Sequence, residues 1–159
     1  MIRTCRPSDL DTLREITIIC FDGTSIDQRI ENAFGRIGET DWRWRKASHI
    51  DADVRANPEG IFVYEESGTV IGYITTRIDP DTRIGSIPNL AVLPQHQGKG
   101  IGKALMAAAL DYFETSGMVL ARIETLEQNK IGTVFYPRTG FREIARQIHY
   151  AMPLKNRKL

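Results

Sequence analysis

The residues best suited to chemistry in this chain are the three alternating glycines of the sequence QGKGIGK, at positions 97–103. They follow an apolar segment that ends at Pro94, and an amphipathic pattern begins directly after them. Glycine lets the backbone approach a ligand closely, and the first turn of a helix has free N–H groups at the positive end of the helix dipole. This segment therefore predicts a phosphate-binding loop.

Two common glycine motifs do not fit this loop. The P-loop of nucleotide-binding proteins needs Gly-x4-Gly-Lys-Ser/Thr, but Gln97 stands five positions before Gly102, and Ala104 replaces the hydroxyl residue. The dinucleotide fingerprint needs Gly-x-Gly-x-x-Gly, but Lys103 takes the place of the third glycine. The pattern that remains is Gln97-x-x-Gly100-x-Gly102.

The elements that must position this loop are predicted from hydrophobic spacing. Helical spacing occurs over residues 10–20, 25–37, 41–55, 100–116 and 129–140. Strand-like patterns occur over residues 2–5, 61–65, 70–78, 84–93, 118–125 and 141–154. Three consecutive strands form an antiparallel meander, and a crossover helix joins it to the next strand. This order predicts an α/β (α+β) fold, with a mixed sheet flanked by helices.

Composition narrows the class of protein. A chain of 159 residues, with 42% apolar and 26% charged side chains, is typical of one globular domain, here residues 1–159. The net charge of +1 gives no reason to expect a nucleic-acid partner, and no apolar run reaches the roughly 20 residues that a membrane span needs. Two cysteines and three scattered histidines predict neither a disulfide framework nor a metal site. We expect a cytoplasmic location.

The glycine loop resembles the acyl-CoA-binding motif of the GNAT superfamily of N-acetyltransferases, Gln/Arg-x-x-Gly-x-Gly/Ala. A second stretch is similar to another signature of that superfamily, with glycine in place of the usual alanine: Asn129-x-x-Gly132-x-x-Phe135-Tyr136-x-x-x-Gly140-Phe141. The two signatures are separated by one predicted helix and one predicted strand, as in the family. The resemblance is strong from about residue 84 to residue 142 and weak before residue 60.

The resemblance implies the GNAT fold, in which splayed central strands of a mixed, mostly antiparallel sheet form a slot for CoA. Pro88 fits this fold, because a proline inside a strand implies a bulge or an unpaired edge. Acetyl-CoA is the implied co-substrate, and no metal is required. The implied cofactor-binding residues are Leu90, Ala91, Val92, Gln97, Gly98, Lys99, Gly100, Ile101, Gly102, Lys103, Asn129 and Tyr136.

Catalysis of acyl transfer to an amine needs a proton acceptor and a proton donor. Tyr136 matches the family's general acid, although a tyrosine packed beneath the last strand is the alternative. Many relatives have a glutamate in the strand before the loop, but residues 85–90 contain no carboxylate. Glu124 and Glu127 are the nearest candidates for the base, and each can equally be a solvated rim residue. Water alone is the remaining alternative.

The acceptor site is expected near the first helices, where both tryptophans of the chain occur. Trp42, Arg43 and Trp44, with Asn89, are the candidate substrate-binding residues, with an arginine binding an anionic group of the acceptor. In the alternative, the tryptophans pack inward and the basic residues point outward. Acidic residues in the same region predict the opposite, a cationic acceptor: Asp22, Asp27 and Glu31.

The resemblance therefore implies an N-acetyltransferase that moves an acetyl group from acetyl-CoA to a small-molecule amine or amino acid, directly within a ternary complex. Two alternatives stay open. One is a protein or peptide N-acetyltransferase, and the other is a non-catalytic module that senses acyl-CoA. The expected partner is the small-molecule amine, without nucleic acid or membrane, and a homodimer is left open.

Overall fold

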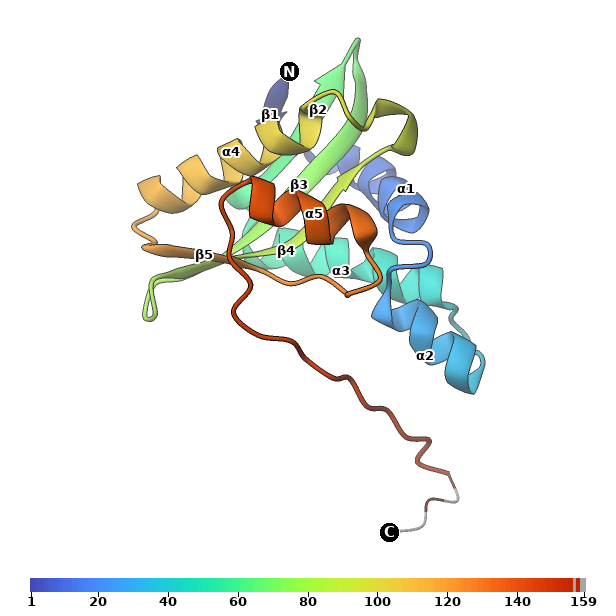
Figure 1. The fold of residues 1–159 in the computed structure, drawn as a ribbon. Coiled ribbons are helices and arrows are strands. Elements are labelled where there is room, and N and C mark those ends of the chain that lie inside the picture. The colour runs from blue at the N-terminus through green and yellow to red at the C-terminus, as the bar shows by residue number, and fades with distance from the viewer. Residues whose placement is uncertain (156, 158–159) are drawn as a thin grey trace.

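The computed structural model describes residues 1–155 and 157, and its centre is an open sheet of five strands in the order β1-β2-β3-β4-β5 (Figure 1). The strands are β1 (Ile2–Thr4), β2 (Ile61–Glu66), β3 (Thr69–Asp79), β4 (Ile84–Val92) and β5 (Leu120–Ile123). The helices are α1 (Leu10–Cys20), α2 (Ile26–Phe34), α3 (Trp42–Ala56), α4 (Ile101–Thr115) and α5 (Lys130–Arg138). Short 3-10 turns cover Pro7–Asp9, Pro58–Gly60 and Pro94–His96.

The sheet is mixed, as predicted. Strands β1 to β4 pair antiparallel, and β5 pairs parallel to β4 after the crossover through α4. None of the helices in the described residues is both long enough and apolar enough to cross a membrane.

Each face of the sheet has its own core, because side chains alternate between faces along every strand. On one face, α4 packs through Leu105, Met106 and Phe113 against strand residues such as Ile74. On the other face, α1 and α3 supply Leu13, Ile16 and Ile50, which pack with Ile61, Val63 and Tyr73. Figure 1 shows α5 beside α4, on the side opposite α1 and α3.

Strand β4 is bulged and splayed at Pro88, as the sequence predicts. Its pairing with β3 skips a residue between Asn89 and Ser86, and its pairing with β5 stops at Ile87. The amides of Asn89 and Leu93 are directed toward β3. The backbone N–H groups of Leu90 and Val92 therefore face the β5 side. Position 88 faces the same side, but Pro88 has no N–H to donate. The missing donor ends the β4–β5 ladder and leaves the backbone of residues 88–92 open on that side.

The segment over residues 41–55, which has irregular hydrophobic spacing, is a regular helix, α3, that starts at an Asp41 cap. The Asp41 side chain accepts a hydrogen bond from the amide of Trp44 at 3.0 Å.

The predicted last strand, residues 141–154, is wrong for the isolated chain: this segment has no regular secondary structure and extends away from the body (Figure 1). Its two-residue alternation of apolar side chains is real, but a strand also needs a partner edge for its backbone hydrogen bonds. Within the described residues this segment pairs with no strand of the sheet.

Candidate functional site

The glycine loop forms one wall of a cavity of about 390 Å³, which we call the loop cavity. Its floor is the open backbone of β4, and its far wall is α5. Among the residues expected to bind a cofactor, all except Lys99 line it: Leu90, Ala91, Val92, Gln97, Gly98, Gly100, Ile101, Gly102, Lys103, Asn129 and Tyr136.

The local conformation of the loop depends on glycine. Gly98 and Gly100 have positive φ angles of 76° and 82°, which side chains with a Cβ rarely adopt. Gly100 stands at the N-cap of α4 with no side-chain cap, so the first amides of the helix are free for a ligand. The side chain of Gln97 donates a hydrogen bond to the carbonyl of Val92 at 2.8 Å, which ties the loop to the end of β4.

The far wall of the loop cavity explains why glycine stands at position 132. Asn129 caps α5 by accepting from the amide of Gly132 at 3.0 Å, and donates to the hydroxyl of Thr125 at 2.9 Å. A Cβ on residue 132 would lie 2.8 Å from Asn129 Nδ2 and 2.9 Å from Thr125 Oγ1. An alanine at this position would therefore require the side chains of Asn129 and Thr125 to shift from the positions they have here.

Tyr136 lies on α5, packed edge-to-face against Phe135 and Phe141. Burial raises the pKa of its hydroxyl to about 12. The phenol therefore keeps its proton at neutral pH and can donate it inside the loop cavity.

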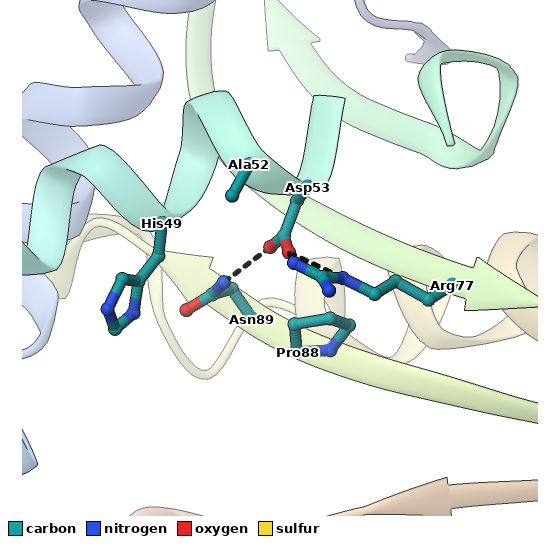
Figure 2. Close-up of a pocket in the computed structure, with 6 residues that line it drawn as sticks. All are labelled: His49, Ala52, Asp53, Arg77, Pro88 and Asn89. Atoms are coloured by element: carbon teal, nitrogen blue, oxygen red, sulfur yellow. Dashed lines mark hydrogen bonds and ion pairs between the residues drawn. The ribbon is translucent and has the colours of Figure 1, made fainter. Parts of the chain in front are cut away.

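A second cavity, of about 250 Å³, lies under α3 and is called here the α3 cavity. It is lined by His49, Ala52, Asp53, Arg77, Pro88 and Asn89. Figure 2 shows His49, Ala52 and Asp53 on the helix, with Asn89 and Pro88 on the strand below and Arg77 approaching Asp53 from the neighbouring strand. Pro88 and Asn89 thus line the α3 cavity, and the next residues of β4, Leu90, Ala91 and Val92, line the loop cavity.

The carboxylate of Asp53 is buried at 1% exposure and fully hydrogen-bonded. Its Oδ1 accepts from Arg77 Nη2 at 2.7 Å and from Arg77 Nε at 3.0 Å. Its Oδ2 accepts from Thr75 Oγ1 at 2.8 Å and from Asn89 Nδ2 at 2.7 Å. With all lone-pair directions used, Asp53 fixes the orientation of Asn89 and has no free position to accept a further proton.

Lys46 is a buried amine that lines neither cavity but contacts one lining residue of each. Its Nζ donates to Asn89 Oδ1 at 2.7 Å and lies 4.0 Å from the centre of the Phe21 ring, which itself lines the loop cavity. Within the described residues, no carboxylate oxygen comes within 4.0 Å of Lys46 Nζ. Burial lowers the pKa of this amine to about 8, although Asp27 and Asp53 oppose the shift.

A model of the acetyltransferase (GNAT) family matches residues 20–141, which is most of the chain. The chain belongs to the GNAT acetyltransferase family. Among curated relatives, it is 34% identical over 85 residues to a mycothiol acetyltransferase from Streptomyces coelicolor. That match covers 54% of this chain and 28% of the relative, so the chain spans under a third of the curated protein it matches.

Solved structures agree on the GNAT fold. The PaiA N-acetyltransferase from Thermoplasma acidophilum, in complex with coenzyme A, superposes with a TM-score of 0.71 at 22% identity over 89% of each chain. The aminoglycoside N-acetyltransferase AAC(6')-Iy, in complex with CoA, gives 0.68 at 18% identity over 96% of this chain and 99% of the other. At these identities the likeness concerns the fold.

Several predicted site residues of this GNAT domain lie outside both cavities. Trp42 is buried, with the guanidinium of Arg43 4.9 Å from the centre of its ring, whereas Trp44 is exposed. Glu127 is exposed and ion-paired with Arg146 at 2.7 Å, and Glu124 is exposed too. The two tryptophan side chains thus lie on different faces of α3, one buried and one exposed, because successive residues of a helix are rotated by about 100°.

The sequence reasoning missed Lys46 and Asp53. Both lie on the buried stripe of α3 with Ile50, at positions i, i+4 and i+7. Charged residues on an apolar stripe were the available signal, since such residues are rarely buried unless they are paired or functional. This signal was hidden because the hydrophobic spacing of residues 41–55 is irregular, so the sequence does not show which face of the helix is buried. Arg77 had no comparable signal.

Proposed function

We propose that this protein transfers the acetyl group of acetyl-CoA to the primary amine of a small molecule, directly and within a ternary complex. The observation that carries the proposal is that the two cavities are lined by consecutive residues of β4: Pro88 and Asn89 line the α3 cavity, and Leu90, Ala91 and Val92 line the loop cavity. In this arrangement, a thioester carbonyl held against β4 from one side is reachable by an amine from the other.

The loop cavity suits the donor. The free amides at the start of α4 and the side chain of Lys103 can bind a pyrophosphate, because both present positive charge or N–H donors to an anion. The backbone of Leu90 and Val92 faces the open side of β4, where a pantetheine arm can pair with it as an added strand. When bound, acetyl-CoA supplies the activated acyl group.

Lys46 is the proposed proton acceptor. As a neutral amine it directs one N–H to Asn89 Oδ1 and keeps its lone pair for the ammonium of the acceptor. This role falls to Lys46 because Asn89 cannot take a proton at neutral pH and because the Asp53 carboxylate already accepts four hydrogen bonds. Glu124 and Glu127 are exposed and contact no residue of the α3 cavity in the hydrogen bonds and ion pairs of the described chain, whereas the Nζ of Lys46 bonds directly to Asn89.

The proposed acetyl transfer combines proton transfers with the exchange of a C–S bond for a C–N bond. Lys46 takes one proton from the acceptor ammonium, and the neutral nitrogen attacks the thioester carbon. The C–S bond then breaks as the tetrahedral intermediate collapses. Tyr136 donates a proton to the departing thiolate and regains one from the new amide nitrogen. The products are the N-acetyl amine and free CoA, and Lys46 releases its proton to solvent.

Exposed donors of the α3 cavity favour an acceptor with an anionic group near its amine, such as an amino acid. The Arg77 side chain lines the cavity and is 46% exposed despite its bond to Asp53, so part of its guanidinium can meet such a group. The acidic residues that predict a cationic acceptor are already paired: Asp27 lies 3.7 Å and Glu31 3.0 Å from the guanidinium of Arg45.

The curated relatives support a small-molecule acceptor, because their name, mycothiol acetyltransferase, refers to a small molecule. The solved structures do not discriminate, because they include both an aminoglycoside N-acetyltransferase and a ribosomal-protein-S18-alanine N-acetyltransferase. The α3 cavity holds about 250 Å³, slightly below the range of about 300–1,000 Å³ that is typical of ligand pockets, and so suits a small acceptor.

The test is CoA release from acetyl-CoA with a panel of acceptors: amino acids, polyamines, an aminoglycoside and lysine-containing peptides. We expect turnover with small amines, highest for those that carry a carboxylate. Turnover restricted to peptides would favour the protein N-acetyltransferase. Acetyl-CoA binding by calorimetry without turnover on any acceptor would favour the sensor.

A further inference from the structure

A continuous chain of hydrogen bonds runs from β3 to α3, on to β4 and back to α3. Arg77 donates twice to Oδ1 of Asp53, at 2.7 Å and 3.0 Å. Oδ2 of Asp53 accepts from Nδ2 of Asn89 at 2.7 Å, and Oδ1 of Asn89 accepts from Nζ of Lys46 at 2.7 Å. Figure 2 shows the amide nitrogen of Asn89 directed toward Asp53 and its oxygen directed away. The carboxylate and the lysine therefore contact opposite ends of a single amide group.

The direction of that amide is set by Asp53. An amide has a donor end and an acceptor end, and a carboxylate can only accept, so it selects the donor end. The hydroxyl of Thr75 donates to the same oxygen of Asp53 at 2.8 Å and accepts from the backbone N–H of Asn89 at 3.0 Å, which ties the strand to the carboxylate. Asp53, Asn89 and Lys46 are at most 8% exposed, so water offers few alternatives to these bonds. The oxygen of Asn89 thus faces Lys46.

The direction of the amide in turn decides where the lone pair of a neutral Lys46 lies. Opposite an oxygen, the amine must present an N–H, and its lone pair stays free for a proton of the acceptor. Opposite an amide N–H, the amine would accept the hydrogen bond with that lone pair and could not take a proton. A buried carboxylate fixes the tautomer of the catalytic histidine in Ser-His-Asp triads by comparable means.

We propose that Asp53 is a positioning residue for acetyl transfer: through the amide of Asn89, it holds Lys46 with the lone pair free to accept a proton. This inference rests on the proposed role of Lys46 as the proton acceptor. Asp53 itself takes no proton, because its two oxygens already accept four hydrogen bonds. It acts across two hydrogen bonds, and its effect on the reaction is the direction of one amide.

The first test is Asp53→Asn, which keeps the shape of the side chain but replaces one acceptor atom with a donor. Arg77 can only donate, so the remaining oxygen at position 53 turns toward it and the new NH2 group faces Asn89. The amide of Asn89 must then reverse and bond to the lone pair of Lys46. We expect kcat/KM at pH 7 to fall about 100-fold with an alkylammonium acceptor, and to change less than about twofold with hydroxylamine, which is neutral at pH 7. Equal losses with both acceptors, or no loss with either, overturn the proposal.

The matched control is Asp9→Asn. Asp9 is a buried carboxylate that also accepts two bonds from one arginine, Arg3, at 2.7 Å and 3.0 Å, and it lines neither cavity. The same chemical change there should lower the thermal midpoint without altering the ratio of the two rates. A ratio that falls as far as in Asp53→Asn would mean that the ratio reports lost stability, and the proposal would be withdrawn.

The exchange variant Asp53→Asn/Asn89→Asp places an oxygen opposite Lys46 again. The amide at position 53 then donates to one oxygen of the carboxylate at position 89, and the other oxygen accepts from Lys46. We expect kcat/KM to rise at least about tenfold above that of the single variant, with the pH profile moved to higher pH because a carboxylate now adjoins the amine. A double variant as slow as Asp53→Asn at every pH would contradict the proposed direction of the amide.

A titration of Lys46, followed by NMR of its Cε group, needs no activity. Burial lowers the pKa of Lys46 to about 8 against the opposing charges of Asp27 and Asp53. His49, whose pKa is lowered by burial and by Lys46, is neutral in that range, and Arg77 stays charged.

The substitution Asp53→Asn should lower the pKa of Lys46 further, because a negative charge is lost and the neutral amine gains a hydrogen bond, whereas the exchange variant should raise it. An equal pKa in the wild type and in Asp53→Asn overturns the proposal. A wild type that acetylates no amine would instead refute the proposed function, and the titration would still decide whether Asp53 sets the state of Lys46.

Discussion

At the level of single residues, the central finding is that the amine of Lys46 is buried, although burial disfavours its charged form. Its Nζ contacts the amide of Asn89 and the ring of Phe21, and no carboxylate oxygen of the described residues lies within 4.0 Å of it. Such placement disfavours the charged form, so the amine is ready to accept a proton near neutral pH. The same burial should weaken the fold.

The substitution Lys46→Met should therefore raise the free energy of unfolding at pH 7 by about 2 kcal/mol, because it removes the charge-burial penalty and loses one hydrogen bond. The pKa of Lys46 falls from 10.5 in the unfolded chain to about 8 in the folded one. The unfolded chain thus binds more protons between those pH values, and wild-type stability rises with pH across that window. The gain from Lys46→Met should be full below pH 8 and vanish by pH 10.5. Urea unfolding at pH 7 and pH 10 measures it, and an equal gain at both would contradict the assignment.

The pH dependence of kcat/KM tests the proposed proton transfer. In the wild type it should rise with pH and level off above about 8, because Lys46 must be neutral to accept a proton. Lys46→Arg keeps the charge but cannot lose its proton, so we expect activity lowered about 100-fold across the range. Hydroxylamine is already neutral at pH 7 and should be acetylated at similar rates by both proteins. An unchanged pH profile in the Arg variant is the result that would count against Lys46.

The substitution Tyr136→Phe should lower kcat about 100-fold and leave the affinity for acetyl-CoA nearly unchanged. The reason is that the hydroxyl, protonated at neutral pH with a pKa of about 12, acts on the leaving thiolate and not on the bound thioester. Steady-state kinetics and calorimetry separate the two effects. An unaltered kcat would show that Tyr136 only packs against Phe135 and Phe141.

At the level of elements, the site depends on where β4 stops pairing. Pro88 ends the ladder with β5, and Asn57 and Thr76 hold the neighbouring end of α3 against β3 through a hydrogen bond of 3.0 Å. Tyr112 of α4 donates to Asn57 at 2.8 Å, so helices on both faces of the sheet meet at this point.

Gly60 leaves the space in which Asn57 and Thr76 contact each other. A Cβ there would lie 2.1 Å from Thr76 Oγ1 and 2.2 Å from Asn57 Nδ2. We expect Gly60→Ala to lower stability by about 3 kcal/mol, since it breaks buried hydrogen bonds. The control Gly102→Ala meets only the Phe135 ring at 3.5 Å and should change stability little. Thermal unfolding of the two variants compares them, and equal midpoints would refute the packing argument.

The sequence predicts elements with strong periodicity and local signals, and fails where long-range packing decides. The antiparallel meander, the bulge at Pro88 and the glycine loop follow from alternation, proline chemistry and motif spacing. The burial of Lys46 beside Asn89 does not, because the two residues are 43 positions apart in sequence and meet only when α3 crosses β4. Residues 141–154 show a third limit: their alternation predicts a strand, but alternation alone does not determine whether the segment pairs with a strand edge.

At the level of the whole molecule, the position of β4 has a thermodynamic consequence. Pro88 and Asn89 line the α3 cavity, and Leu90, Ala91 and Val92, which follow directly in the same strand, line the loop cavity. If acetyl-CoA and the acceptor occupy these cavities as proposed, a shift of the strand that one ligand causes reaches the other ligand. The two binding events are then linked, and linkage is reciprocal: each ligand changes the affinity of the other by the same factor. Five consecutive residues of one splayed strand would in this way couple the donor site to the acceptor site.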